Sequence, residues 1–227
     1  MFMEEERAQV TAYGMRMITE GLAAGTSGNI SIFNPETGYM AISPSGIPYD
    51  ETKAEDIVIM DLDGHIIDGV RKPSSEFELH SNIYKLRSDI KALVHAHSVY
   101  CTTLACMGQP LRAVHYAIAD AGTPELPLAP YETFGTPALA KAVAGSIGDK
   151  AKGLLMANHG MIAGGSTLKE AFGLALTMEW CAQIQWRCMC AGHMNVLTDE
   201  QMADAFRKYS TYGQKKPGDG SGSQGYF

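Results

Sequence analysis

The sequence predicts a mixed α/β fold in which a largely antiparallel central sheet is sandwiched between helices, giving three layers. Short apolar runs of strand length are paired around turn residues such as Asp63-Gly64, and such pairs form antiparallel hairpins. Stretches with helical spacing of apolar residues come before, between and after these strands, so helices can cover both faces of the sheet. With 227 residues, the chain has the size of one α/β domain.

The N-terminal part is expected to contain one long helix and two hairpins. Apolar residues recur at helical spacing over residues 4–24, and Gly25 predicts the end of that helix. Strands are then expected at residues 30–33, 39–42, 57–61 and 65–67. Turn residues at 34–38 and Asp63-Gly64 join these strands in pairs. This part of the sheet is therefore expected to be antiparallel.

The remainder is expected to alternate helices with strands. A helix should open at Pro73-Ser74-Ser75-Glu76, because serine is a favoured N-cap and an acid suits the first turn. It should reach residue 87. Further strands are expected at 92–97, 153–156 and 161–163, and further helices at 100–107, 136–144, 168–190 and 199–209, with an irregular proline-rich stretch at 109–133. Residues 1–213 are predicted to form one domain and the Gly/Ser-rich residues 214–227 a flexible tail.

Charge and cysteine content exclude several classes of protein. The net charge of -7 argues against general nucleic-acid binding and against binding to a membrane surface through basic residues. The five cysteines include no CxxC pair, and three lie in one predicted helix, so a disulfide framework is not expected. The acidic N-terminus lacks the apolar core of a signal peptide, and no apolar run is long enough to span a membrane. A cytoplasmic location is predicted.

Three histidines and a glutamate predict a metal site. His95 and His97 lie two apart on a predicted strand, so both imidazoles point to one face. His159, which precedes a glycine at a strand end, would complete a His₃ site, and a catalytic zinc has three protein ligands and one open position. Glu76 could supply a further oxygen ligand or a base. A lone buried histidine is more often a hydrogen-bonded core residue, so the prediction depends on the whole set.

Three turns of small residues predict a phosphate site. They are Gly25-Thr26-Ser27-Gly28-Asn29, Ser43-Pro44-Ser45-Gly46 and Ser74-Ser75. Each presents backbone N–H groups and hydroxyls without bulk, which suits a phosphate. Each alone is more often an ordinary turn or cap, and none is a P-loop or a Rossmann fingerprint. Beside the metal set, they indicate a phosphorylated substrate next to a Lewis acid.

These segments, together with several others, resemble the class II aldolase/adducin family. The similarity runs in the family's order and reaches about residue 213. The further matching segments are Ile47-Pro48-Tyr49, His115-Tyr116, Ala129-Pro130-Tyr131-Glu132-Thr133-Phe134-Gly135-Thr136 and Thr211-Tyr212-Gly213. Each piece is common, but the combination is specific.

The resemblance implies a role for each matching residue. His95, His97 and His159 would bind one Zn²⁺, with Glu76 as metal ligand and acid/base. Tyr116 would assist proton transfer, and Tyr212 would help to close the site. The residues implied in substrate and phosphate binding are Gly28, Asn29, Ser45, Gly46, Ser74, Ser75 and, near the aldehyde end, Phe134. The resemblance also implies a homotetramer with active sites at subunit interfaces.

The implied reaction is the reversible retro-aldol cleavage of a ketose 1-phosphate to dihydroxyacetone phosphate and an aldehyde. The first expectation is L-fuculose 1-phosphate, which gives L-lactaldehyde, as in fucose degradation. D-ribulose 1-phosphate and a 5-deoxypentulose 1-phosphate remain open, because small differences in an aldehyde pocket are worth only about 1–3 kcal/mol. Cobalt or manganese could replace zinc. No lysine lies in a motif that suggests a Schiff base.

Two other functions are compatible with the resemblance. A ketopentose-phosphate 4-epimerase of the L-ribulose-5-phosphate type would use the same scaffold, but such enzymes carry Asp at the position of Glu76 and lack the segments at 115–116 and 131–134. A non-catalytic interaction domain, as in the adducin branch, would be expected to lack metal ligands. The residues of this chain therefore favour the aldolase.

Overall fold

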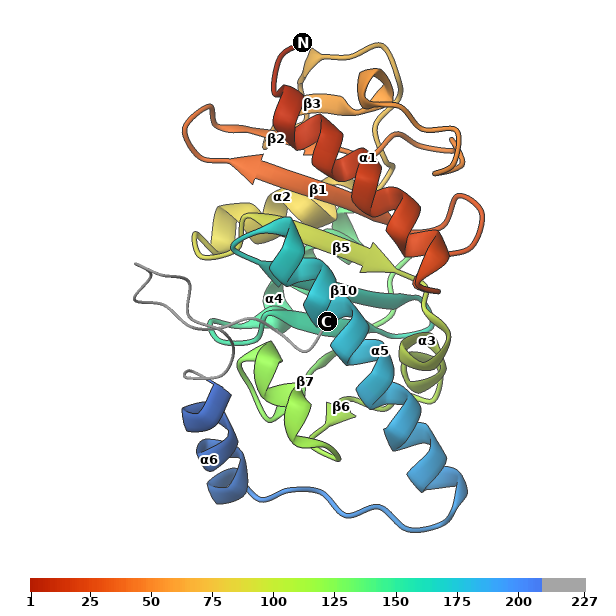
Figure 1. Ribbon diagram of the computed structural model, residues 1–227, viewed down its shortest axis with the longest axis vertical. Coiled ribbons are helices and arrows are strands. Elements are labelled where there is room, and N and C mark those ends of the chain that lie inside the picture. The colour runs from red at the N-terminus through yellow and green to blue at the C-terminus, as the bar shows by residue number, and fades with distance from the viewer. Residues whose placement is uncertain (210–227) are drawn as a thin grey trace.

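The computed structural model describes residues 1–209, and its centre is an eight-stranded sheet (Figure 1). The order across the sheet is β4-β3-β2-β1-β5-β10-β9-β8. The strands are β1 (Asn29–Asn34), β2 (Tyr39–Ile42), β3 (Val58–Asp61), β4 (Ile66–Asp68), β5 (Ala92–Ala96), β8 (Leu128–Ala129), β9 (Gly153–Met156) and β10 (Gly160–Gly165). A separate ribbon pairs β6 (Leu111–Arg112) with β7 (Glu125–Leu126).

The sheet is mixed and largely antiparallel, as predicted. Every described pairing within it is antiparallel except that of β8 with β9. The two early hairpins, β1–β2 and β3–β4, form where the turn residues predict them. The mixed character comes from the edge strand β8, which is too short to be recognised from the sequence.

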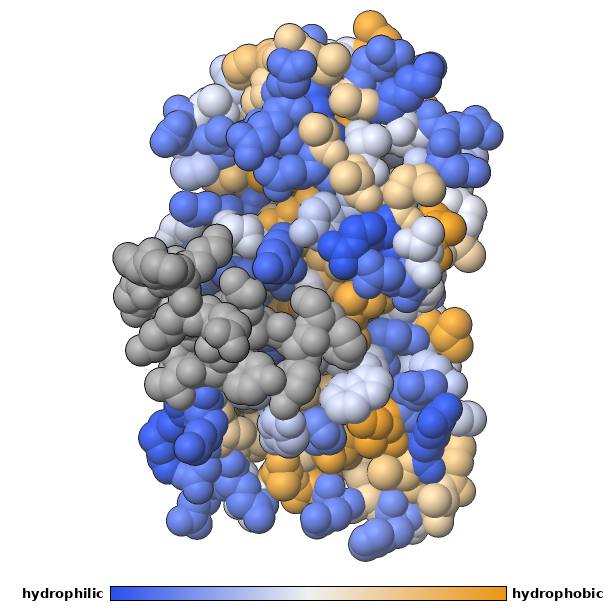
Figure 2. Space-filling model, in the orientation of Figure 1, coloured by the Kyte–Doolittle hydropathy of each residue, from blue (hydrophilic) through white to orange (hydrophobic). Residues whose placement is uncertain are grey.

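Helices cover both faces, which gives the three layers. In Figure 1, α1 (Glu4–Thr19) and α5 (Leu168–Cys190) lie in front of the sheet, and α2 (Phe77–Leu86) and α4 (Pro137–Ile147) lie behind it. Helix α3 (Val99–Cys106) packs beside α5, and α6 (Asp199–Tyr209) packs on the short 3₁₀ helix η2 (Tyr116–Ala121). Another 3₁₀ turn, η1, spans Ala54–Asp56. The face shown in Figure 2 is largely hydrophilic, with apolar areas between, as is usual for globular proteins.

The middle of the sheet positions the candidate site. Strand β5 is buried along its whole length between β1 and β10. Its register places His95 beside Asn29 of β1 and Ile162 of β10. A residue at this place is held by hydrogen bonds on both sides, so its side chain has a fixed origin.

Several predicted boundaries are wrong. Helix α1 ends at Thr19 rather than at residue 24, because Gly21 adopts a φ of 77° and Leu22 N–H bonds to Met17 O. Helix α4 ends at Ile147 rather than at residue 144, and the next residue, Gly148, has a φ of 65°. The stretch at 109–133, expected to be irregular, contains β6, β7, β8 and η2.

The start of α2 also differs from the prediction. Its N-cap is Glu76 and not a serine, and no side chain caps it. Ser74 instead takes part in the turn before the helix, where its hydroxyl accepts a hydrogen bond from Glu76 N–H. Tyr212 and the predicted tail at 214–227 lie outside the described residues. Among residues 1–209, none of the helices is both long and apolar enough to cross a membrane.

Candidate metal centre and active site

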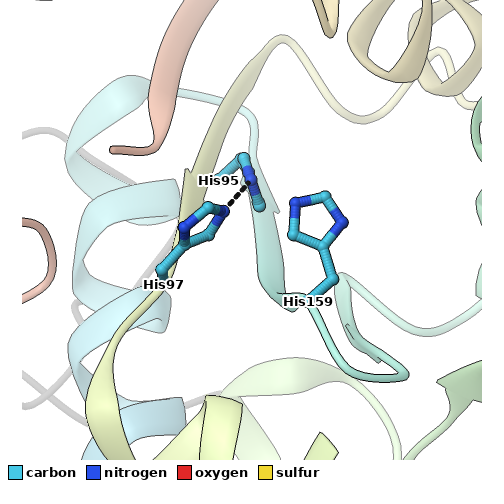
Figure 3. A group of neighbouring side chains, drawn as sticks. All are labelled: His95, His97 and His159. Atoms are coloured by element: carbon cyan, nitrogen blue, oxygen red, sulfur yellow. Dashed lines mark hydrogen bonds between the residues drawn. The ribbon is translucent and has the colours of Figure 1, made fainter. Parts of the chain in front are cut away.

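Three imidazoles form a nearly equilateral triangle (Figure 3). The ring centroids of His95, His97 and His159 are 4.9, 4.9 and 5.0 Å apart, and their ligand nitrogens all lie within 4.8 Å of one another. His95 comes from β5, His97 follows that strand, and His159 lies in the turn between β9 and β10. The structure therefore brings together all three histidines that the sequence predicts.

The turn that carries His159 depends on its two neighbours. Asn158 has a φ of 54°, a left-handed conformation that asparagine tolerates better than most residues. At Gly160, a Cβ would lie 2.4 Å from Ala96 O and 3.0 Å from His97 Cδ2. Only glycine lets β10 approach β5 this closely, and that approach places His159 opposite His97.

Gly160→Ala is expected to lower the free energy of unfolding by about 1–3 kcal/mol and to weaken metal binding. The clash is with backbone and with His97, neither of which can move away freely. Urea unfolding and a zinc titration measure the two effects. Gly145→Ala in α4, where a Cβ meets nothing within 4 Å, is the control and should not destabilise. Equal behaviour of the two variants would contradict this account.

His95 is oriented to offer one particular nitrogen. Its Nδ1–H donates to Met161 O at 2.8 Å, which leaves Nε2 facing the triangle. This Nε2 lies 3.1 Å from His97 Nε2. A tetrahedral zinc with Zn–N bonds of about 2.0–2.1 Å would hold two nitrogens about 3.3–3.4 Å apart. The spacing of these nitrogens thus fits a metal with little adjustment.

Two of the three imidazole rings are in the neutral form that can bind a metal. Burial and the neighbouring His95 lower the pKa of His97 to about 4 and that of His159 to about 4, so both rings are neutral at neutral pH. Burial also lowers the pKa of His95, but the Glu76 carboxylate outweighs this effect, and the net shift is upward. Of the three rings, His95 is therefore the one that takes up a proton most readily.

Zinc affinity is expected to weaken as the pH falls, because a protonated imidazole cannot bind the metal. The Glu76 carboxylate raises the pKa of His95, whereas the pKa values of His97 and His159 are lowered to about 4, so His95 is the first of the three rings to take up a proton as the pH falls. Zinc titrations at a series of pH values measure the effect. A zinc affinity that stays constant or rises as the pH falls would contradict this account.

Glu76 completes the cluster from the start of α2. Its Oε2 lies 3.2 Å from His95 Nε2, and its Oε1 lies 3.3 Å from His159 Nε2. Burial raises the pKa of this carboxyl, but the charge and hydrogen bond of His95 outweigh burial and hold the pKa well below its usual range. Among the described residues, Oε1 is buried without a hydrogen-bond donor, although it is within ion-pair distance of His159. A buried, unsatisfied anionic oxygen beside three imidazole nitrogens suits a divalent cation.

The predicted phosphate turns lie side by side. Ser45 N–H donates to Lys72 O and Ser74 N–H donates to Ser43 O, which joins the second turn to the third. Ser43 is also bonded to Ile30, just after Gly28-Asn29. Ser45, Gly46 and Ser75 are exposed, whereas Ser74 is buried. Their convergence next to Glu76 is compatible with the predicted role.

The side chain of Asn29 is hydrogen-bonded inside the protein. Its side chain is only 4% exposed, and both ends of its amide are used inside the protein. Nδ2 donates to Glu76 Oε2 at 2.9 Å, and Oδ1 meets His80 Nε2. In this structure the side chain of Asn29 supports Glu76 and is not free to hold a phosphate.

Tyr116 and Phe134 are exposed aromatic residues. Tyr116 begins η2, is 42% exposed, and its ring centroid is 4.5 Å from that of His115. Phe134 is 68% exposed, and the adjacent Gly135 lies against Ser75. The 131–135 segment therefore borders the phosphate turns, and the role of Phe134 at the aldehyde end stays a prediction.

Sequence reasoning missed Ser31 and Tyr84, which lie behind Asn29. His80 is bonded to Ser31, which is bonded in turn to Tyr84. A signal was present: Glu76, His80 and Tyr84 are spaced by four, which places them on one helical face. The structure shows that this face meets β1.

A model of the Class II Aldolase and Adducin N-terminal domain matches residues 8–186. The chain belongs to the class II aldolase and adducin family. It is 49% identical over 215 residues to a 5-deoxy-D-ribulose 1-phosphate aldolase of Bacillus thuringiensis serovar kurstaki, covering 95% of this chain and 100% of that relative. A 5-methylthioribulose-1-phosphate/5-deoxyribulose-1-phosphate aldolase of Rhodospirillum rubrum is 40% identical over 199 residues, with 87% and 88% covered.

The solved structure of an L-fuculose 1-phosphate aldolase has the same fold. The TM-score is 0.89 at 40% identity, with 92% of this chain and 98% of that chain covered. The family and the mixed α/β architecture predicted from the sequence are thus confirmed. Since these relatives are aldolases over nearly their whole lengths, the chain is an enzyme of the class II aldolase type.

Proposed function

We propose that this enzyme is a zinc-dependent aldolase that cleaves a ketose 1-phosphate reversibly to dihydroxyacetone phosphate and an aldehyde. The observation that carries the proposal is the position of Glu76. Its carboxylate lies against the histidine triangle. Its backbone directly follows Ser74-Ser75, where the serine turns converge. A metal site and a phosphate site are thus joined at one acidic residue.

Each group of the candidate site has a proposed role in the reaction. When bound, a zinc ion acts as a Lewis acid for the negative charge that develops at the C2 carbonyl during cleavage of the C3–C4 bond. Ser45, Ser74 and Ser75 anchor the phosphate and so orient the three-carbon half. In the direction of synthesis, the Glu76 carboxylate takes a proton from the hydroxymethyl carbon of dihydroxyacetone phosphate, and in cleavage it returns a proton to that carbon, the former C3. Tyr116 exchanges a proton with the C4 oxygen.

The proposed substrate is a 5-deoxypentulose 1-phosphate, with L-fuculose 1-phosphate as the second candidate. Both relatives described above act on 5-deoxyribulose 1-phosphate by name, and one of them shares 49% of its residues with this chain. The likeness to an L-fuculose 1-phosphate aldolase supports the second candidate. The two sugars give the same phosphate product but different aldehydes, acetaldehyde and L-lactaldehyde respectively.

A coupled assay for dihydroxyacetone phosphate tests the function. The zinc-loaded enzyme is incubated with each ketose 1-phosphate, with and without a chelator, and the aldehyde is identified. Chelator-sensitive release with acetaldehyde as the faster product is expected. Release of neither product from zinc-loaded protein would contradict the proposal, and interconversion of pentulose 5-phosphates without cleavage would establish the epimerase instead.

The active assembly is proposed to be a homotetramer with shared sites. The exposed rings of Tyr116 and Phe134 support this, because large aromatic rings are costly to leave in water. Tyr212 is proposed to help close the site, although it lies outside the described residues. Light scattering should give the mass of four chains of 24.5 kDa each, and a monomer would contradict the assembly. The cytoplasmic location stays a prediction.

A further inference from the structure

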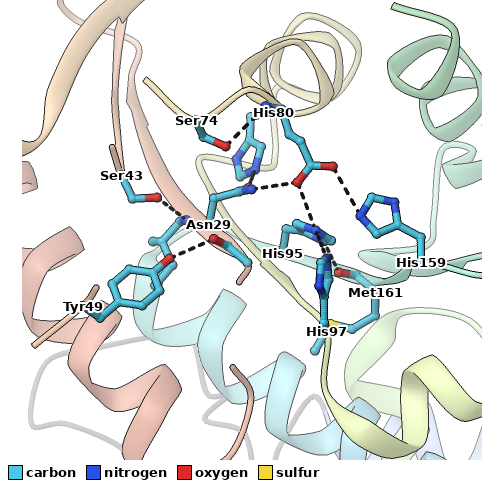
Figure 4. A network of polar contacts seen from close by, with 12 residues as sticks. Asn29, Ser43, Tyr49, Ser74, His80, His95, His97, His159 and Met161 are labelled. Carbon is cyan, nitrogen blue, oxygen red and sulfur yellow. Dashed lines mark hydrogen bonds and ion pairs between the residues drawn. The ribbon is translucent and has the colours of Figure 1, made fainter. Parts of the chain in front are cut away.

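A buried row of polar side chains connects α2 with β1 behind the candidate metal site. Glu76, His80 and Tyr84 are four residues apart on the helix side, and Asn29 and Ser31 are two apart on the strand. Four helical residues advance by about 6 Å and two strand residues by about 6.7 Å, so the two sets interdigitate. Part of this network is visible in Figure 4.

Each hydrogen bond in this row has only one possible direction once Glu76 is ionised. A carboxylate only accepts, so Asn29 must turn its amide nitrogen to Glu76 Oε2, at 2.9 Å. Asn29 Oδ1 then faces His80, which must donate from Nε2. His80 Nδ1 is left as an acceptor for the Ser31 hydroxyl, at 2.6 Å.

The hydrogen bond between Tyr84 and Ser31, at the end of the row away from Glu76, also has only one possible direction. Tyr84 OH lies 2.6 Å from Ser31 Oγ and 3.1 Å from Ser31 O. Because Ser31 has given its only proton to His80, the Tyr84 hydroxyl is the donor to Ser31. Every donor in the row thus points toward Glu76.

Burial isolates this row from water. His80 and Ser31 are 0% exposed, and Tyr84 is 4% exposed. Burial and the nearby His95 lower the pKa of His80 to about 3, and burial raises the pKa of Tyr84. His80 is therefore a neutral imidazole with a fixed tautomer at any physiological pH.

We propose that His80 is a positioning residue for Glu76. Its Nε2–H holds the Asn29 amide in the one orientation that donates to Glu76 Oε2, which keeps Oε1 turned to the histidine triangle. Ser31 and Tyr84 act on His80 by fixing its tautomer. Without His80, the amide can rotate and present Oδ1 to the carboxylate, which would repel Glu76 from its place. The inference about turnover rests on the aldolase function proposed above.

The first test compares His80→Phe with His80→Gln in the zinc-loaded enzyme. Phenylalanine fills the space without a donor, whereas glutamine can restore an N–H toward Asn29. We expect His80→Phe to lower kcat by about 10–100-fold, with KM within about threefold and zinc content unchanged, and His80→Gln to recover part of the loss.

A matched control separates positioning from stability. Ile83→Ala lies on the same helix at a fully buried position without a polar side chain, and it should lower the Tm while leaving kcat within about twofold. A kcat for His80→Phe within twofold of wild type, or a kcat that falls only in step with the Tm as in Ile83→Ala, would overturn the proposal.

A second readout does not depend on activity. Nitrogen-15 NMR of the wild-type imidazoles should show His80 neutral and protonated at Nε2, both with zinc and after chelation. Protonation at Nδ1, or a charged ring at pH 7, would overturn the proposal even in an active enzyme. If the wild-type enzyme lacks aldolase activity but His80 has the expected tautomer, the proposed function fails and the arrangement around Glu76 stands.

Discussion

Replacing His95 by alanine is expected to remove the bound metal and the aldolase activity together. His95 is fully buried on the central strand, and its Nε2 is aimed into the triangle by the hydrogen bond from Nδ1 to Met161 O. Losing one of three nitrogen ligands leaves a site that holds zinc weakly. Because a Lewis acid contributes several kcal/mol to charge stabilisation, kcat/KM should fall by at least about 10³-fold. Zinc content by atomic spectroscopy and the coupled assay measure both effects.

His65→Ala is the matched control for this experiment. His65 is exposed near a hairpin turn, and its ring pairs with Asp61. The control should keep its zinc and its activity. A His95→Ala protein with one zinc per chain and wild-type turnover would show that the metal is bound elsewhere.

Glu76→Gln is expected to lower kcat by about 10²–10⁴-fold, the usual range for loss of a general acid or base. Glutamine has nearly the same shape, but its amide cannot take a proton from the substrate carbon or return one to it. The serine turns do not involve its carboxylate, so the affinity for dihydroxyacetone phosphate should change little. Assays at saturating zinc give kcat, and exchange of the hydroxymethyl proton of dihydroxyacetone phosphate, followed by NMR, reports on the proton transfer itself.

Glu78→Gln tests whether removal of any acid near the start of α2 has the same effect. Glu78 lies in the first turn of that helix, and its backbone carbonyl accepts from Ser81. The variant should turn over normally. If Glu76→Gln instead retained wild-type exchange and turnover, the acid/base role would belong to another residue.

Much of the fold was predictable because it depends on local signals. Alternating apolar runs around turn residues predicted the hairpins β1–β2 and β3–β4, and helical spacing predicted α5 and α6 with the bounds that the structure shows. The boundary of α1 was wrong because Gly21, rather than Gly25, takes the left-handed conformation that ends the helix. Strand β8 was not predicted, because a strand of two residues is too short to show an alternating pattern.

The candidate metal ligands were predictable for a similar reason. His95 and His97 share a face because side chains on an extended chain repeat every two residues, and this holds in any context. His159 and Glu76 were proposed as their partners because one precedes a glycine at a strand end and the other follows two serines, and the family resemblance implied the same two residues. The structure places both against the pair, so the resemblance and the geometry agree.

The family, the mixed sheet and the candidate metal ligands could be predicted from the sequence, since these predictions depend on periodicity, turn chemistry and a specific set of motifs. The surroundings of Glu76 could be seen only in the folded chain. The bond from Asn29, the tautomer of His80 and the contact of Ser31 with Tyr84 all join α2 to β1 across some fifty positions of chain. No local pattern encodes such partners, because a buried polar group takes whichever donor or acceptor the packing of distant segments brings within reach.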